Sequence, residues 1–135
     1  MKIQEDNGIY VLDTHVLILY FIGSKRLHKK LRDTIDRVRN KDGRLLIPTI
    51  VLAEALDIAE KFRVEFDFDE MYRLIQEYAE FEIAGFGEEV LNEAMKLKKI
   101  KEIHDRIIVA TAMYYGAGIL TKDRVITESG EVRIV

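Results

Sequence analysis

Short apolar runs alternate with longer amphipathic stretches along the chain. Five runs have the length and composition of buried strands, at residues 9–12, 45–47, 81–84, 118–120 and 132–135. Six stretches have the apolar spacing of helices, at residues 15–22, 27–39, 50–62, 68–80, 88–99 and 106–115. This alternation predicts a three-layer α/β/α fold around a mostly parallel five-stranded sheet. Ligand sites in such folds form outside the carboxyl ends of the strands.

Composition narrows the class of protein. The 135 residues contain no repeat or linker, which predicts a single domain over residues 1–135. A formal charge of -3 excludes a strong global attraction for nucleic acid or membranes, and the lack of cysteine excludes disulfides, thiolate metal sites and cysteine nucleophiles. No apolar run is long enough to span a membrane, so we expect a cytoplasmic protein with no membrane partner. Charged residues make up 33%, a bias that matches thermophile composition.

Three acidic residues stand at the predicted ends of buried elements. Asp13 follows the first strand, Asp123 comes shortly after the fourth, and Asp105 precedes the apolar helix at 106–115. Asp13 and Asp105 would each suit the N-cap of the following helix, and Asp123 would suit a turn. Position alone therefore leaves a structural and a functional role open for each. By contrast, Asp67 and Glu70 have the spacing of a capping box and are interpreted as structural.

Glu54 is harder to explain by structure alone. Its helical neighbours Ile50, Val51 and Ile58 form an apolar stripe, which predicts that the carboxylate faces the interior. An unpaired buried carboxylate costs several kcal/mol or shifts its pKa upward, so it requires a cation, a donor or access to solvent. Asp57, three residues further on, indicates that this face is near the solvent edge of the helix.

Four acids are candidate metal ligands: Asp13, Glu54, Asp105 and Asp123. Two unit negative charges ~4 Å apart repel by ~4 kcal/mol at an effective dielectric of ~20, so clustered carboxylates need a compensating charge. Oxygen ligands select Mg2+, Mn2+ or Ca2+ over zinc or copper, and the first two commonly serve phosphoryl transfer. His15 and His104 adjoin two of the acids and could add ligands or contact substrate, although a supporting structural role is favoured.

Four short segments carry a family resemblance. They are VLDTH at 11–15, VLAEA at 51–55, HDRIIVATA at 104–112 and LTKDR at 120–124. In order and spacing they resemble the signatures of the PIN-domain nucleases, and within that family the VapC-like toxins of type II toxin-antitoxin pairs. Position by position, the resemblance implies that Asp13, Glu54, Asp105 and Asp123 bind Mg2+ or Mn2+. It also implies cleavage of RNA, a homodimer, and an antitoxin whose tail occupies the site.

The chemistry implied is metal-assisted hydrolysis of a phosphodiester. Asp13 and Asp105 would anchor the ion, and Glu54 would complete its shell or orient the water. Thr14 or Thr121 would hydrogen-bond a ligand or a phosphate. Asp123 would hold a weaker second ion, and it is the least typical ligand. Many toxins carry a further acid and an aromatic residue soon after the fourth acid, whereas residues 124–126 here are Arg, Val and Ile.

A locally basic segment at residues 25–44 offers a surface for RNA. It holds nine Lys and Arg residues against three Asp. The candidate RNA contacts are Lys25, Arg26, Lys29, Lys30 and Arg32. Such a face would make binding salt-dependent, and a solvated helix face explains the pattern equally well.

Two other interpretations stay open. A receiver-like signalling domain also combines a five-stranded parallel sheet with Mg2+-binding acids. It normally has paired acids after the first strand, whereas Thr14 follows Asp13 here. The second is a non-catalytic PIN scaffold that binds RNA or protein. The presence of all four acids argues against that interpretation.

Overall fold

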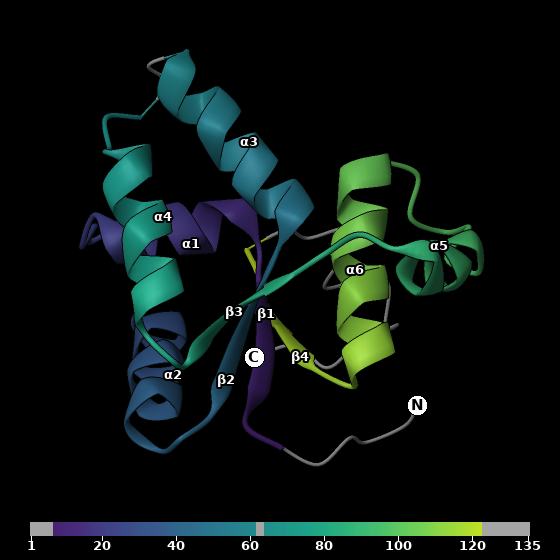
Figure 1. Cartoon of the computed structure of the whole chain (residues 1–135), viewed down its shortest axis with the longest axis horizontal. Coiled ribbons are helices and arrows are strands. Elements are labelled where there is room, and N and C mark those ends of the chain that lie inside the picture. The colour runs from purple at the N-terminus through teal and green to yellow at the C-terminus, as the bar shows by residue number, and fades with distance from the viewer. Residues whose placement is uncertain (1–6, 62–63, 123–135) are drawn as a thin grey trace.

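The structure is a computed structural model that describes residues 7–61 and 64–122 (Figure 1). The strands are β1 (Ile9–Leu12), β2 (Arg44–Pro48), β3 (Phe81–Ala84) and β4 (Gly118–Leu120). The helices are α1 (Thr14–Phe21), α2 (Lys29–Asn40), α3 (Thr49–Glu60), α4 (Phe68–Glu77), α5 (Glu88–Met95) and α6 (Ile103–Tyr115).

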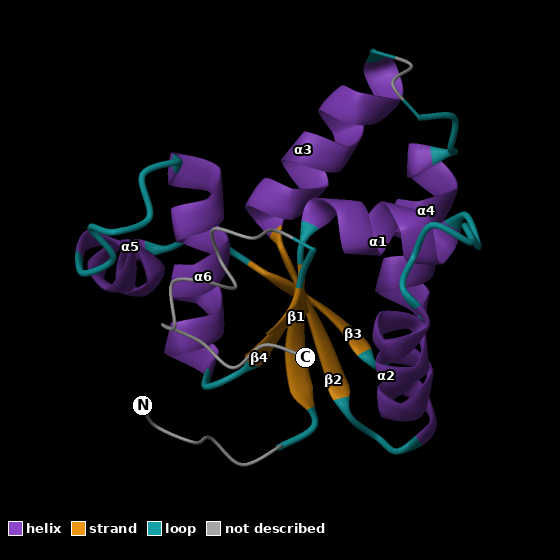
Figure 2. Ribbon diagram, turned by 180° about the vertical axis from the view of Figure 1, so that it is seen from behind, coloured by secondary structure: helices purple, strands orange, loops and turns teal. Residues whose placement is uncertain are grey.

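The four strands form one parallel sheet in the order β3-β2-β1-β4. Tyr10 of the central strand lies opposite Leu45 on one side and Gly118 on the other. Helices α1, α2 and α4 lie on one side of the sheet, and α5 and α6 lie on the other (Figures 1 and 2). Helix α3 extends beyond the edge where the strands end. Because both faces are covered, β1 and β2 are apolar and mostly buried rather than alternating, apart from the exposed Arg44 at the start of β2.

The predicted α/β/α fold is confirmed. Four of the expected strands are present to within one residue at each end. The fifth, at 132–135, lies outside the described residues, so the described sheet has four strands rather than five. All six helices are present, and Asp67 caps α4 by accepting the amide of Glu70 at 3.0 Å, as the capping-box spacing predicts. No helix in the described ranges is long and apolar enough to cross a membrane.

Several helix ends differ from the prediction. Helix α2 begins at Lys29 rather than residue 27, because the side chain of His28 caps it by accepting the amide of Lys30 at 3.1 Å. Helix α5 ends at Met95 rather than residue 99. Leu97 and Ile100 are buried in the turns that follow, so the apolar spacing continues after the helix has ended. Helix α4 likewise ends three residues before the predicted position.

Candidate active site

Asp13 lies at the carboxyl end of β1, and the residue is buried, with 6% of its surface exposed. Its Oδ1 accepts the amide of Val16 at 2.9 Å, so Asp13 is the N-cap of α1. Its Oδ2 accepts a hydrogen bond from the hydroxyl of Thr121. Burial raises the pKa of the Asp13 carboxyl, and the hydrogen bonds from Thr121 and Val16 oppose this rise. A buried carboxylate that neutral donors compensate only in part is favourably placed for a cation.

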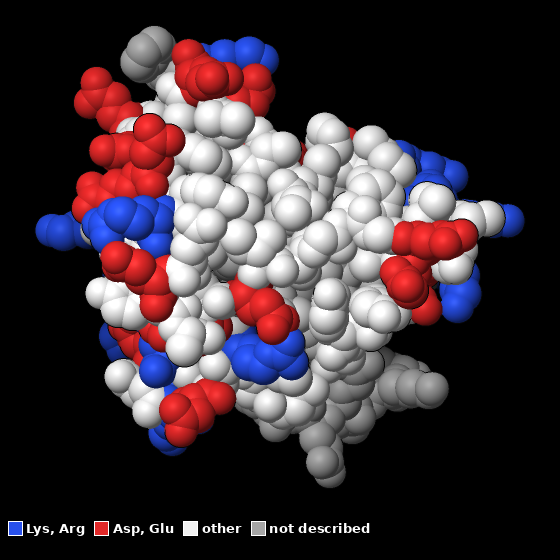
Figure 3. Space-filling view, viewed as in Figure 1, with Lys and Arg blue, Asp and Glu red and all other residues white. Residues whose placement is uncertain are grey.

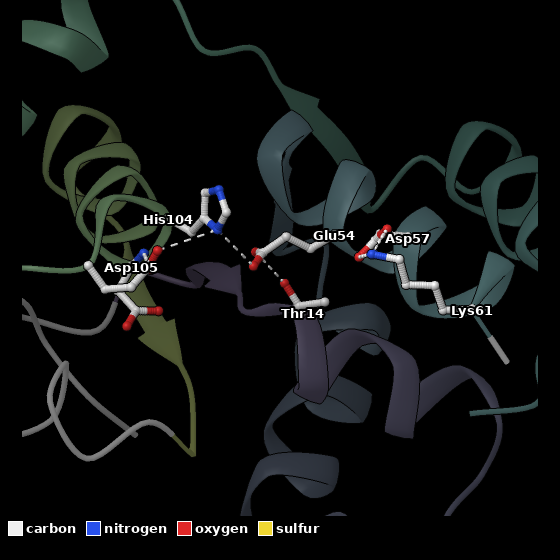
Figure 4. Close-up of polar contacts among 7 residues, drawn as sticks. Thr14, Glu54, Asp57, Lys61, His104 and Asp105 are labelled. Carbon is white, nitrogen blue, oxygen red and sulfur yellow. Dashed lines mark hydrogen bonds and ion pairs between the residues drawn. The ribbon is translucent and has the colours of Figure 1, made fainter. Parts of the chain in front are cut away.

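Glu54 projects from α3 between α1 and α6 (Figure 4). The hydroxyl of Thr14 donates to its Oε1 at 2.8 Å, and Nδ1 of His104 lies 3.4 Å from its Oε2. The side chain of Glu54 is 30% exposed, so the predicted interior position is only partly right. Asp57 instead pairs with Lys61, the C-cap of the same helix, at 2.9 Å, as expected of a residue at the solvent edge.

Asp105 lies in the first turn of α6 and is not its N-cap. The helix begins at Ile103, three residues earlier than predicted, and Glu102 caps it by accepting the amide of Asp105 at 2.8 Å. The N-cap explanation of Asp105 is therefore wrong. Its carboxylate is not used to cap the helix and lines the same pocket as Asp13.

One pocket of about 740 Å³ brings three of the four predicted acids together. Asp13, Glu54 and Asp105 all line it, at the edge of the sheet where the strands end. We call this the acidic pocket. Asp123 lies outside the described residues. Thr14, His15, Arg26 and Lys122 also line the acidic pocket, with apolar residues of α1, α3 and α6.

The donor types of the acidic pocket fit a hard divalent cation, because three carboxylates from separate elements face one hollow. In residues 7–61 and 64–122, however, no three acidic or histidine side chains lie close enough together to hold one ion. The described acids therefore share a pocket without forming a closed set of ligands.

The predicted supporting residues surround these acids. Thr14 and Thr121 are buried, and each hydrogen-bonds a carboxylate. His15 is exposed at the pocket rim, and His104 is half-exposed between Glu54 and Glu102, whose Oε1 lies 3.5 Å from its Nδ1.

The predicted RNA contacts separate into two groups. Lys25, Arg26, Lys29 and Arg32 line a second hollow, whereas Lys30 is exposed and does not line it. Lys122 lines both hollows and was not predicted. Its position next to Asp123 is the sequence signal that could have identified it.

The model of the PIN domain matches residues 10–131, a span that contains all four predicted acids. The chain belongs to the PIN-domain family. Members of this family are nucleases, which supports a nuclease role for this protein. Family membership sets aside the receiver-like interpretation.

Several solved structures share this fold. VapBC2 from Rickettsia felis, bound to a promoter DNA fragment, has a TM-score of 0.73 and 16% identity over 94% of this chain and 97% of that chain. A toxin-antitoxin complex from Klebsiella pneumoniae has a TM-score of 0.64 and 19% identity, over 93% and 95%. DNA-bound VapBC from Salmonella typhimurium has a TM-score of 0.68 and 17% identity, over 93% and 96%. No curated protein sequence matches the chain.

Proposed function

We propose that this PIN domain is a metal-dependent ribonuclease that hydrolyses phosphodiester bonds at the acidic pocket. One observation carries the proposal. Asp13, Glu54 and Asp105, which come from three separate elements, line one pocket at the carboxyl ends of the strands. Family membership supports nuclease chemistry. The burial of Asp13 supports a cation, since a bound positive charge would compensate its carboxylate.

Mg2+ or Mn2+ suits these oxygen donors. Asp13 and Asp105 would hold the ion with Glu54, and Asp123 would contribute from outside the described residues. When bound, such an ion supplies a Lewis acid that activates water and neutralises charge on the phosphate. The chain itself orients the ligands, because the hydroxyl of Thr121 holds Asp13 and the hydroxyl of Thr14 holds Glu54.

End-mapping of cellular RNA tests this function. The purified protein is incubated with total RNA in Mn2+, in chelator, and as the Glu54→Gln variant in Mn2+. Gln keeps an oxygen that can accept the hydroxyl of Thr14 and removes the charge. Cuts that need Mn2+ and disappear in Glu54→Gln would support the proposal. Binding of RNA and Mn2+ by the wild type without any cut would favour the non-catalytic PIN scaffold.

A toxin role with an antitoxin partner is part of the same proposal. The structure from Klebsiella pneumoniae that shares this fold is a toxin-antitoxin complex, which supports a similar partner here. A toxin that cuts cellular RNA would act in the cytoplasm. Co-purification with the product of a small neighbouring gene that encodes a DNA-binding fold tests the partner. A chromosomal neighbourhood without such a gene would favour a role in RNA processing.

A homodimer also belongs to the proposal. On the face shown in Figure 3, charged side chains gather over α4 and the far end of α3 on one margin, and over α5 on the other. The upper part of the surface between them is uncharged, and acidic and basic side chains lie side by side below its centre. Exposed apolar side chains occur on the elements around this face: Leu56 on α3, Phe86 after β3 and Ile103 on α6. Sedimentation equilibrium of the purified protein tests this state, and a monomer at high concentration would contradict it.

A further inference from the structure

We propose that a basic pocket beside the acidic pocket binds phosphates of the RNA strand next to the bond that is cleaved. The inference rests on the proposed ribonuclease function and adds the path of its substrate. The basic pocket is formed by the connection between α1 and α2, the first turns of α2 and the residue after Thr121. Its cationic lining residues are Lys25, Arg26, Lys29, Arg32 and Lys122.

The two pockets are continuous, because Arg26 and Lys122 line both of them. A strand whose scissile phosphate lies against Asp13 must place neighbouring phosphates in an adjoining hollow. Carboxylates by themselves repel phosphate, so an approaching strand needs cations close to the site. The shared wall supplies two of them, and the rest of the basic pocket continues the positive charge along one direction away from Asp13.

Hydrogen bonds hold the basic pocket in place before any ligand arrives. The hydroxyl of Ser24 accepts the amide of Arg26 at 3.1 Å, and the carbonyl of Ser24 accepts a bond from the guanidinium of Arg32. Nζ of Lys122 donates to the carbonyl of Arg26 at 3.1 Å. Leu27 is buried and anchors the same segment in the core. The Arg32 guanidinium, the Lys122 ammonium group and the backbone of Arg26 are therefore held in place, which lowers the entropic cost of binding at these positions.

Little negative charge opposes the cations of the basic pocket. Asp33 is the one acidic side chain among the described residues that line it, and its pair with Lys29 at 3.1 Å is highly exposed and therefore weak. Lys25 and Arg26 form no ion pair within the described ranges. The amino terminus of α2, a helix of 12 residues, adds a partial positive charge. RNA is favoured over an acidic peptide because the same strand would occupy both pockets.

Two charge-matched double variants test the proposal. Lys25→Ala/Lys29→Ala removes two cations of the basic pocket. Within the described residues, neither ammonium group donates a hydrogen bond to the backbone, and that of Lys29 contacts only the side chain of Asp33. Lys41→Ala/Lys98→Ala makes the same change in net charge elsewhere. Lys41 is the C-cap of α2, about 18 Å along the helix from its first residue, and Lys98 follows α5.

Binding is measured by fluorescence anisotropy with a labelled single-stranded RNA of about ten nucleotides in chelator, over a range of salt concentrations. Each phosphate contact contributes about 0.7 to the slope of log K against log salt for a single strand. Loss of two contacts should therefore lower the slope by about 1.4 and the affinity by roughly 10- to 30-fold at ~0.1 M salt. The control variant should stay within about twofold of the wild type.

Equal losses in the two double variants would overturn the proposal, because net charge alone would then explain them. A polyglutamate peptide is added as a competitor. If it displaces the RNA, and if its own binding requires Lys25 and Lys29, the basic pocket would be assigned to an acidic protein partner instead. The same RNA in Mn2+ separates this proposal from the nuclease. RNA binding that depends on Lys25 and Lys29 but leads to no cleavage would support the proposed basic pocket and contradict the proposed nuclease activity. If Lys25→Ala/Lys29→Ala cleaves dilute RNA at the wild-type rate, the nuclease activity would be supported and the proposed basic pocket contradicted.

Discussion

Replacement of Asp13 by Asn separates the chemical role of this side chain from its structural role. In the wild type, Oδ1 caps α1 through the amide of Val16, and Oδ2 accepts the hydroxyl of Thr121. Asn keeps an oxygen for the amide of Val16 and is as good an N-cap as Asp. Its NH2 group can donate to the oxygen of Thr121, which reverses that bond without losing it. The variant should therefore keep these two hydrogen bonds and remove the charge, and it weakens the bond from the backbone amide of Lys122 to the carboxylate.

The free energy of unfolding of Asp13→Asn should equal or exceed that of the wild type at neutral pH. Burial raises the pKa of Asp13 in the folded state, so ionised Asp13 destabilises the fold above that pKa. The Tm of the variant should therefore equal or exceed that of the wild type, and each kcal/mol of difference moves Tm by roughly 3–5 °C for a chain of this length. As the pH falls through the raised pKa toward the ordinary value of 3.8, Asp13 becomes protonated in the folded protein. The difference between the two proteins should then shrink.

Thermal unfolding from neutral to acid pH without divalent metal measures this difference, and RNA cleavage in Mn2+ measures activity. Turnover should fall by at least about 100-fold, because removal of groups that merely hold a metal ligand already costs ~10–100-fold. Retained turnover would refute the catalytic role of Asp13. A Tm several degrees below that of the wild type at neutral pH would refute the argument about its buried charge.

Two further predictions concern the metal and its supporting hydroxyl. If Mn2+ binds with a Kd of ~1 mM, ~10 mM Mn2+ should raise the free energy of unfolding of the wild type by about 1.4 kcal/mol. A thermal-shift assay should show this stabilisation in the wild type and none in Asp13→Asn. Equal stabilisation of both proteins would place the ion elsewhere. Thr14→Val removes the hydroxyl that donates to Glu54, so cleavage should fall roughly 10–100-fold with little change in Tm. Thr34→Val, which removes a buried hydroxyl within α2, should cleave at the wild-type rate, and equal rates in both variants would show that Thr14 is not needed.

The strands were predictable because burial on both faces of the sheet produces uninterrupted apolar runs in the sequence. An uninterrupted apolar run has few alternatives when turn residues bound it, as Gly8 and Asp13 bound β1. The ends of helices are less clearly indicated by the sequence. In α5 the apolar spacing continues into turns that are buried but not helical, and in α6 an N-cap at Glu102 competes with one at Asp105. Local capping geometry decides both cases, and residue type alone does not determine it.

The shared pocket was predictable for Asp13 and Asp105 from their positions near a strand end and a helix start, and for Glu54 from its place on an apolar helix face. The orientation of Glu54 was not, because it depends on a hydroxyl 40 residues away in the sequence. Lys122 was missed for a similar reason. Its ammonium group binds a backbone carbonyl 96 residues away, and such a contact requires no particular residue type at the acceptor.

The two supporting hydroxyls also couple the position of one acid to that of another. Thr121 holds Asp13 from the end of β4, and Asp13 in turn caps the helix whose first residue, Thr14, holds Glu54. A change that removes the cap therefore disturbs both carboxylates, even though only one residue is altered. Asp13→Ala would combine loss of a ligand, loss of the N-cap and displacement of Glu54, and its inactivity would not distinguish among them. Asn is the informative substitution because it removes the charge while the chain of hydrogen bonds that positions Glu54 remains.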